Sequence, residues 1–308
     1  MSATCPVCAN SSSGFPVVQG GVRDARDDYA PEALQCGDCT AVFLWPRMNG
    51  EAQRRFYETN AQIDRTHGQA FDWNDYTRKT RADVMRRVRF LESHLAPTDI
   101  LLEVGCGYGF FLSEIAEHVG TAIGIEPGPD RRAFATGELG LDVRPPPLRD
   151  AGIEPASIDM ACAFHVLEHV DRPVTFLSEI RDALRPGGRL VVEVPNVADL
   201  YNRLSPAYRA FHFQSAHLIY FDPATLRRVL EDSGFVIESL IGVQRYAFAN
   251  ALHWLTTGRP QLNRPSRLVN SGPAQAFDGL YRRCLELTGR SDTLLCIARN
   301  SRSSPETP

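Results

Sequence analysis

Four cysteines near the start of the chain are spaced like the ligands of a zinc site. Cys5 and Cys8 form one C-x2-C pair, and Cys36 and Cys39 form a second. Two such pairs usually make a closed tetrahedral site of four thiolates, which has no open position for chemistry. Two disulfides are the alternative, but a chain without an export signal is expected in a reducing compartment. The spacing therefore predicts structural zinc in a small zinc-ribbon domain over residues 1–48.

The charge of this ribbon argues against nucleic acid as its partner. The ribbon carries two more acidic than basic residues: Arg23, Arg26 and Arg47 against Asp24, Asp27, Asp28, Glu32 and Asp38. Contacts with phosphates require the opposite sign. The whole 308-residue chain is also mildly acidic, with 33 Lys+Arg against 37 Asp+Glu and a net charge of −4.

A glycine loop is the second chemical feature. Gly105, Gly107 and Gly109 follow the apolar run 100–104 and precede a helical pattern over 110–119. Glycines let the backbone approach a ligand at the carboxyl end of a sheet. The G-x-G-x-G spacing differs from the G-x-G-x-x-G of a dinucleotide loop, so NAD is disfavoured.

An acidic residue completes this pattern. Glu126 ends the next apolar run, 121–125, and lies 21 residues after Gly105. At that place a carboxylate can hold both hydroxyls of a ribose. Each feature alone is common, but their order within one strand–helix–strand unit predicts a cofactor that contains a nucleoside.

Alternating elements must position these residues. Strands are expected at 100–104, 121–125, 158–164, 189–194, 235–243 and 293–298, with helices at 110–119, 173–184 and 223–230. Repeated strand–helix units predict an α/β fold with a parallel sheet and right-handed crossovers. Pro186-Gly187-Gly188 is expected to stop the helix 173–184 before the next strand.

The remaining segments frame this core. Residues 49–96 form a helical connector whose apolar positions recur at helical spacing: Val84, Val88, Leu91 and Leu95. Its many basic residues, Arg86 and Arg87 among them, are expected on a solvated face. The core spans 97–300 with an insertion at 246–290, and residues 301–308 are expected to form a disordered tail.

The chain resembles the class I S-adenosylmethionine (SAM)-dependent methyltransferases. The resemblance covers about residues 97–245 through Glu103–Gly109, Glu126, the strand ending at Phe164, the segment 166–170 and the segment 184–188. It implies a Rossmann-like seven-stranded sheet whose last strand, 293–298, is antiparallel. It also implies a set of residues at the SAM site: Glu103, Gly105, Gly107, Gly109, Glu126 and Phe164.

A narrower resemblance comes from the ribbon and the core together. This combination is similar to the zinc-containing sugar C-methyltransferases of natural-product pathways. That group places a Tyr and a Glu just before a catalytic His, and the segment 214–217 keeps His217 without either partner. Methylation at oxygen, nitrogen or carbon therefore stays open.

Histidines offer the proton chemistry that methyl transfer requires. His217 or His165 is expected as the general base, because the pKa of histidine lies near working pH. Alternatively, both bind a divalent metal together with Glu168 and His169. A third interpretation is that Glu168 and His169 only cap the following helix.

These features predict a cytoplasmic enzyme that methylates a small molecule. The acceptor is expected to be a sugar-containing or other natural-product intermediate. No apolar run approaches the 18 residues of a membrane span. One alternative is an RNA or protein methyltransferase that recognises its substrate through the ribbon. Another is a non-catalytic SAM-binding partner subunit, and the sequence does not indicate an oligomeric state.

Overall fold

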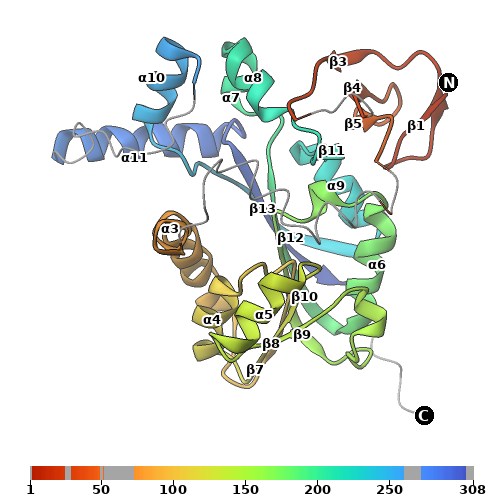
Figure 1. Ribbon diagram of the computed structural model, residues 1–308, viewed down its shortest axis with the longest axis vertical. Helices are drawn as coiled ribbons and strands as arrows, with labels where there is room; N and C mark the ends of the chain where they lie inside the picture. Colours follow the sequence, from red (N-terminus) through yellow and green to blue (C-terminus); the bar gives the residue numbers. More distant parts are fainter. Residues whose placement is uncertain (1, 25–28, 49–50, 52–72, 260–271, 303–308) are drawn as a thin grey trace.

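A seven-stranded sheet forms the centre of the molecule (Figure 1). The computed structural model describes residues 2–24, 29–48, 51, 73–259 and 272–302. The strands are β6 (Ile100–Val104), β7 (Thr121–Ile125), β8 (Asp142–Arg144), β9 (Ile158–Phe164), β10 (Leu184–Pro195), β12 (Phe235–Val243) and β13 (Thr293–Asn300). Their order is β12-β13-β10-β9-β6-β7-β8, and β13 is antiparallel to both of its neighbours. The predicted Rossmann-like methyltransferase sheet is confirmed.

Helices cover both faces of this sheet because successive strand residues point in opposite directions. Leu101 packs in one core with helices α3 (Trp73–Leu91) and α4 (Phe110–Ile115). Its neighbour Leu102 packs in the other core with α6 (Pro173–Ala183) and α9 (Pro223–Asp232). The described residues of this part also include helix α5 (Pro129–Gly137) and the short 3-10 helices η1 (Glu92–His94), η2 (Ala116–His118), η3 (Leu148–Asp150) and η4 (Leu167–His169).

The N-terminal ribbon shares its main sheet with the core. The ribbon has a β1–β2 pair and a sheet of order β11-β5-β4-β3. Its strands are β1 (Ala3–Thr4), β2 (Ser11–Ser12), β3 (Val17–Gln19), β4 (Glu32–Gln35) and β5 (Val42–Trp45). The fourth member of the sheet, β11 (Ile219–Tyr220), comes from the core and pairs with Phe43 and Val42. Phe43 of the ribbon also packs in the same apolar core as Leu102 of the central sheet.

Four further helices lie beyond the carboxyl ends of the central strands. They are α7 (Leu200–Leu204), α8 (Pro206–His212), α10 (Phe248–Thr257) and α11 (Gly272–Leu287). In Figure 1 α10 and α11 project on the side away from the ribbon. Asp199 and Ser205 cap α7 and α8 by accepting hydrogen bonds from backbone N–H groups. No helix in the described part of the chain is long and apolar enough to cross a membrane.

Three local expectations were wrong or incomplete. Pro186, Gly187 and Gly188 do not separate a helix from a strand but lie inside β10, whose register shifts between Leu184 and Arg189. The expected helix 110–119 divides into α4 and η2. Strand β8 and helix α5 were missed. The three residues of β8 are too few to show the alternating pattern of a strand.

Candidate functional site

The four N-terminal cysteines come together as their spacing predicts. Their sulfur atoms all lie within 4.8 Å of one another. The Cys5–Cys39 and Cys8–Cys36 sulfurs are both 3.5 Å apart, well beyond the ~2.05 Å of a disulfide bond. Four thiolates around one Zn²⁺ would be separated by about 3.8 Å, given a Zn–S distance of ~2.3 Å. The arrangement therefore fits a tetrahedral metal better than two disulfides.

The electrostatics of the four sulfurs also call for a cation. Burial raises the pKa of the Cys5 thiol to about 11. For Cys36 burial opposes ionisation too, but backbone N–H groups of Cys39 and Asp38 lower its pKa. Four sulfurs this close repel one another once ionised, and a divalent cation removes that repulsion.

The glycine loop has the shape that its sequence predicts. Gly105, Gly107 and Gly109 have φ of 75°, 57° and 80°, in the left-handed region that favours glycine. A Cβ on Gly105 would collide with the side chain of Val166. A Cβ on Gly107 would meet nothing within 4 Å. The loop thus packs against Val166, just after β9, at Gly105, and it leaves free space beside Gly107.

Glu126 is fixed beside this opening. Its Oε2 accepts a hydrogen bond from the backbone N–H of Gly107 at 2.9 Å. Its Oε1 accepts from the N–H of Gly128 and from Nε of Arg131, both at 2.7 Å. The carboxylate is 3% exposed and is held in place at the edge of the loop, where the ribose of SAM was expected.

Glu103 presents an unsatisfied buried oxygen near the same loop. The residue is 4% exposed, and its Oε2 has no hydrogen-bond partner among the described residues. Burial raises the pKa of Glu103 to about 8. A buried acceptor without a partner is costly, and a cationic group would satisfy it. The residues of the loop therefore fit SAM, which carries an ammonium and a sulfonium.

Phe164 is the last residue of β9, and its ring packs against the guanidinium of Arg87. Its ring meets Phe111 edge to face, with the centroids 4.9 Å apart. The guanidinium carbon of Arg87 lies over the ring, 4.5 Å from the Phe164 centroid. The side chain is therefore a packed wall next to the loop.

The segment after β9 turns sharply at His165. His165 has φ of 56°, an uncommon value for a residue other than glycine. Its Nδ1 lies 3.3 Å from Glu168, and its Nε2 lies 3.1 Å from Glu193 and 2.9 Å from Arg245. Although burial opposes it, Glu168 and Glu193 raise the pKa of His165. Both ring nitrogens are thus engaged, with two carboxylates and the guanidinium of Arg245 around them.

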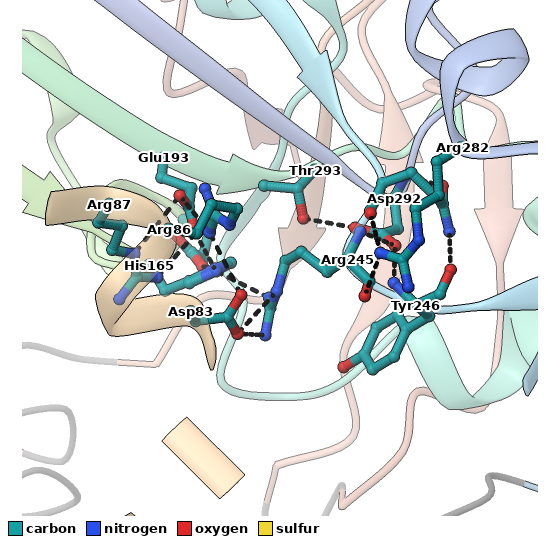
Figure 2. A network of polar contacts seen from close by, with 12 residues as sticks. Asp83, Arg86, Arg87, His165, Glu193, Arg245, Tyr246, Arg282, Asp292 and Thr293 are labelled. Carbon is teal, nitrogen blue, oxygen red and sulfur yellow. Dashed lines mark hydrogen bonds and ion pairs between the residues drawn. The ribbon is translucent and has the colours of Figure 1, made fainter. Parts of the chain in front are cut away.

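Figure 2 shows the network that surrounds Glu193 on β10. The Glu193 side chain is fully buried and binds Arg86 at 2.9 Å and Arg87 at 2.7 Å, both from α3. Although burial opposes ionisation, Arg87 and His165 hold the pKa of Glu193 well below its usual range. The expected solvated face was therefore wrong for Arg86 and Arg87. The signal that could have revealed this is a single acid inside the apolar run of β10.

Arg245 extends the network toward β13, as Figure 2 shows. Its guanidinium binds Asp83 of α3 at 2.8 Å, and its backbone N–H donates to Asp292 at 3.0 Å. Asp292 also accepts from the hydroxyl of Thr293 at 2.7 Å. The network connects α3, β10, β12 and β13 beyond the carboxyl end of the sheet, and sequence reasoning did not find Asp83, Arg245 or Asp292.

A second cluster of ligand-type side chains lies beside His165. Glu168, His169 and His217 each offer an atom within 4.8 Å of the others. The Oε2 of Glu168 is buried and has no hydrogen-bond partner in the described part of the chain. The Nδ1 of His169 lies 2.8 Å from the carbonyl of Ala216 and donates to it, which directs Nε2 toward Glu168 at 3.9 Å. The structure thus brings together the histidines and the acid that the sequence singled out.

His217 is placed by the ribbon. The N–H of Arg23 donates to the carbonyl of Phe213, and the N–H of Ser215 donates to the carbonyl of Arg23. After His217 the chain enters β11 and joins the ribbon sheet. Burial and the neighbouring His169 lower the pKa of His217 well below its ordinary value. Its imidazole is therefore neutral, with a side-chain nitrogen of Gln214 2.8 Å from Nε2.

Comparisons with known proteins identify the family of this chain. The methyltransferase domain family matches residues 76–240, more than half of the chain. A probable SAM-dependent methyltransferase of Mycolicibacterium smegmatis is 30% identical over 144 residues, covering 46% of this chain and 54% of that protein. The human mitochondrial ubiquinone biosynthesis O-methyltransferase is 26% identical over 176 residues, covering 50% and 46%. The chain thus spans about half the length of these curated relatives.

A solved structure shows the same fold. A SAM-dependent methyltransferase of Thermotoga maritima, described as a possible histamine N-methyltransferase, superposes with a TM-score of 0.52 at 17% identity. The match covers 81% of this chain and all of that one. The chain belongs to the methyltransferase domain family.

Proposed function

We propose that this enzyme methylates a small molecule, a sugar-containing or other natural-product intermediate, at an oxygen, nitrogen or carbon atom. One observation carries the proposal: the segment with Glu168 and His169 packs directly on the cofactor loop, through the contact of Val166 with Gly105. An acceptor held at this segment would lie next to the methyl group. Oxygen is the acceptor that we favour, because a hydroxyl must lose a proton and the segment lies beside a neutral histidine.

The cofactor would be held by residues of the glycine loop and its neighbours. Glu126 would bind the ribose through Oε2, Glu103 would face the ammonium, and the open backbone at Gly107 would face the methionine part. SAM supplies an activated methyl group, so the protein must align the acceptor and remove its proton.

His217 is the residue that we propose as the general base. Its ring lies in the cluster with Glu168 and His169, whereas both ring nitrogens of His165 already contact Glu168, Glu193 and Arg245. We therefore assign His165 a positioning role, because it ties the segment after β9 to β10.

A divalent metal is the second candidate for activating the acceptor. Glu168, His169 and His217 would hold it, and the unpartnered oxygen of Glu168 favours this possibility. Bound there, a metal would lower the pKa of the acceptor hydroxyl. The donation from His169 to Ala216 fixes the tautomer that such a ligand needs.

We also propose that Cys5, Cys8, Cys36 and Cys39 bind one structural Zn²⁺. Their mutual distances and the absence of disulfides among them support this. The metal would stabilise the ribbon, whose contacts at Arg23 and β11 hold the segment carrying His217.

The first experiment tests the class of acceptor. The purified protein is incubated with methyl-labelled SAM and an extract from a source strain that lacks the gene, and the products are separated by size. Label in small molecules supports the proposal. Label only in nuclease- or protease-sensitive material indicates an RNA or protein substrate instead. SAM binding without any label indicates a non-catalytic subunit.

A second experiment separates the two ways of activating the acceptor. With the acceptor identified, His217→Ala should lower kcat by about 10²–10⁴-fold, whereas His118→Ala, at an exposed histidine of η2, should leave it unchanged. Mild chelation that leaves one Zn²⁺ per chain should not affect activity if His217 is the base. Loss of activity that Mg²⁺ or Mn²⁺ restores would instead assign His217 to a metal site.

A further inference from the structure

Two helices at the periphery of the molecule carry an exposed apolar surface. Helices α10 and α11 project from the body on the side away from the ribbon (Figure 1). Half of the large apolar side chains that are exposed in the described part of the chain lie on these two helices: Leu252, Leu255, Phe277, Leu280 and Leu287. Apolar side chains gathered in this way mark a surface that binds a partner, whereas scattered ones need no explanation.

The exposed residues of the two helices form one continuous surface. Four residues of α11 follow the three- and four-residue spacing of a single helix face: Phe277, Leu280, Cys284 and Leu287. On α10, Leu252 and Leu255 share a face with Phe248. The ring of Phe248 meets that of Phe277 edge to face, with the centroids 4.9 Å apart. The two stripes therefore join, and we call the joined surface the α10–α11 face.

The inner side of α11 is already engaged by the core. Arg282 donates to the backbone carbonyls of Gln244 and Arg245 at 2.6 and 2.9 Å. The backbone N–H of Gln244 donates to Glu286 at 3.0 Å, and Leu285 is buried. These contacts fix the rotation of the helix about its own axis. The apolar stripe on the other side of α11 is therefore held outward and cannot turn in to cover itself.

The charges beside the α10–α11 face argue against a lipid surface as its partner. Helix α10 has no Asp, Glu, Lys or Arg, and α11 has two acids and two arginines: Asp278, Arg282, Arg283 and Glu286. Arg282 also pairs with Asp278 at 2.7 Å. Helices that lie on membranes carry an excess of Lys and Arg on their polar side, which attracts anionic lipids. A face without net charge suits another protein surface of the same kind.

The area of this face matches what one partner of a stable dimer contributes. Its five large exposed residues are 46–76% exposed. Together they offer about 500 Å² of apolar surface, taking ~180 Å² for a large apolar side chain. One partner in a standard interface buries about 800 Å², of which about 57%, or about 450 Å², is apolar. Two identical faces placed against each other would therefore supply the apolar part of such an interface.

We infer that the α10–α11 face binds a second copy of this chain and forms a symmetric dimer. Two-fold pairing places the same apolar side chains against each other from both copies, so it needs no complementary surface elsewhere on the molecule. The contact would also hold α11 in place, and through Arg282 the end of β12 that carries Arg245. The inference concerns assembly alone and does not depend on the acceptor that the enzyme methylates.

Sedimentation of the full-length, zinc-loaded protein over a concentration series tests this inference. At about 50 µM the protein should be a dimer, since interfaces of this size have dissociation constants between about 1 µM and 1 pM. Leu280→Arg places a charge in the middle of the face and should raise the dissociation constant about tenfold or more. The matched control, Val236→Arg, makes the same kind of change at an exposed residue of β12 and should leave the dimer intact. S-adenosylhomocysteine binding in each variant shows that it is folded.

A cysteine within the stripe reports whether this face forms the contact. Cys284 is exposed, whereas the other seven cysteines are buried or half-buried, four of them in the zinc site. Its side chain is small and adds little area to the interface. A maleimide should label Cys284 slowly at concentrations where the dimer forms and rapidly after dilution. In Leu280→Arg the labelling should be rapid at every concentration.

Three results would overturn the inference. The first is a wild-type protein that stays monomeric over the whole concentration series. The second is a dimer that Leu280→Arg weakens no more than Val236→Arg does, which would place the contact on another face. The third is a monomer that sediments with vesicles of phosphatidylcholine and phosphatidylglycerol and loses this binding in Leu280→Arg, which would assign the face to a membrane.

Discussion

At the scale of the residue, the candidate cofactor site combines glycines of positive φ, a carboxylate fixed by hydrogen bonds, and one buried acid with an unpaired oxygen. Gly105 and Gly107 both have positive φ, but only Gly105 lies against a side chain, that of Val166. Glu126 is fixed by backbone N–H groups and Arg131, whereas Glu103 keeps a buried oxygen without a partner. A cationic cofactor therefore gains most at Glu103.

Glu103 predicts how SAM binding depends on pH. Burial raises its pKa to about 8, so the acid is mostly neutral at pH 6, and the ammonium of SAM favours its ionised form. Between pH 6 and 7.5, below the pKa of about 7.7–8.0 of an α-amino group, affinity should rise by up to tenfold per pH unit. Calorimetry at several pH values measures this slope, and Glu103→Gln should abolish it. A slope that persists in the variant would contradict this role.

Glu103 makes the stability of the folded protein fall as pH rises, whereas it makes the affinity for SAM rise. The unfolded chain releases this proton near pH 4.5, whereas the folded protein keeps it until about pH 8. The folded state therefore binds more protons in this window, and the contribution of Glu103 to the free energy of unfolding falls as pH rises.

At the scale of the element, the sequence predicted the strands well because the strands buried on both faces are continuous apolar runs. The ranges 100–104, 121–125 and 158–164 are reproduced as β6, β7 and β9. The range 235–243 is reproduced as β12, although this edge strand is partly exposed. The polar network was not predictable in the same way. Helical periodicity shows which face of α3 is polar, but not that Arg86 and Arg87 meet Glu193 from a strand far along the chain.

Glu193 predicts a large loss of stability on substitution. Glu193→Gln removes the negative charge that pairs with Arg86 and Arg87, and it leaves the two guanidinium groups close together in a buried site. Breaking a buried pair in this way typically costs about 3–5 kcal/mol. Urea unfolding measures the change. Glu238→Gln makes the same substitution at a partly exposed acid and should cost about 1 kcal/mol or less; equal losses would show that the network is not special.

At the scale of the whole molecule, the ribbon and the methyltransferase core are joined at the segment that places His217. Ribbon residues pair with β11, and Phe43 packs in a core of the central sheet. The C-x2-C pairs were visible in the sequence because they are local. The shared strand was not visible, because β11 has only two residues and its partner lies in the first 45 residues of the chain.

Removal of zinc should therefore destabilise both the ribbon and the segment of the core that it holds. We expect one Zn²⁺ per chain by mass spectrometry of the metal, and Cys5→Ser should reduce this content and lower the Tm by several degrees. S-adenosylhomocysteine binding should survive at low temperature, because the glycine loop lies in the core. Cys284→Ser, at an exposed cysteine of α11, is the matched control and should change neither zinc content nor Tm. A Cys5→Ser protein with unchanged zinc and Tm would contradict the assignment.

The strand shared between ribbon and core also bears on how the chain is made. Phe43 emerges from the ribosome long before Ile219, its partner in the sheet. At about 5–20 residues per second, the outer edge of β5 waits on the order of 10–35 s without its neighbour. An unpaired apolar strand edge is a template for association with other chains. Early binding of metal to the two knuckles would hold the ribbon compact during that delay, and the availability of zinc would then govern the yield of folded enzyme.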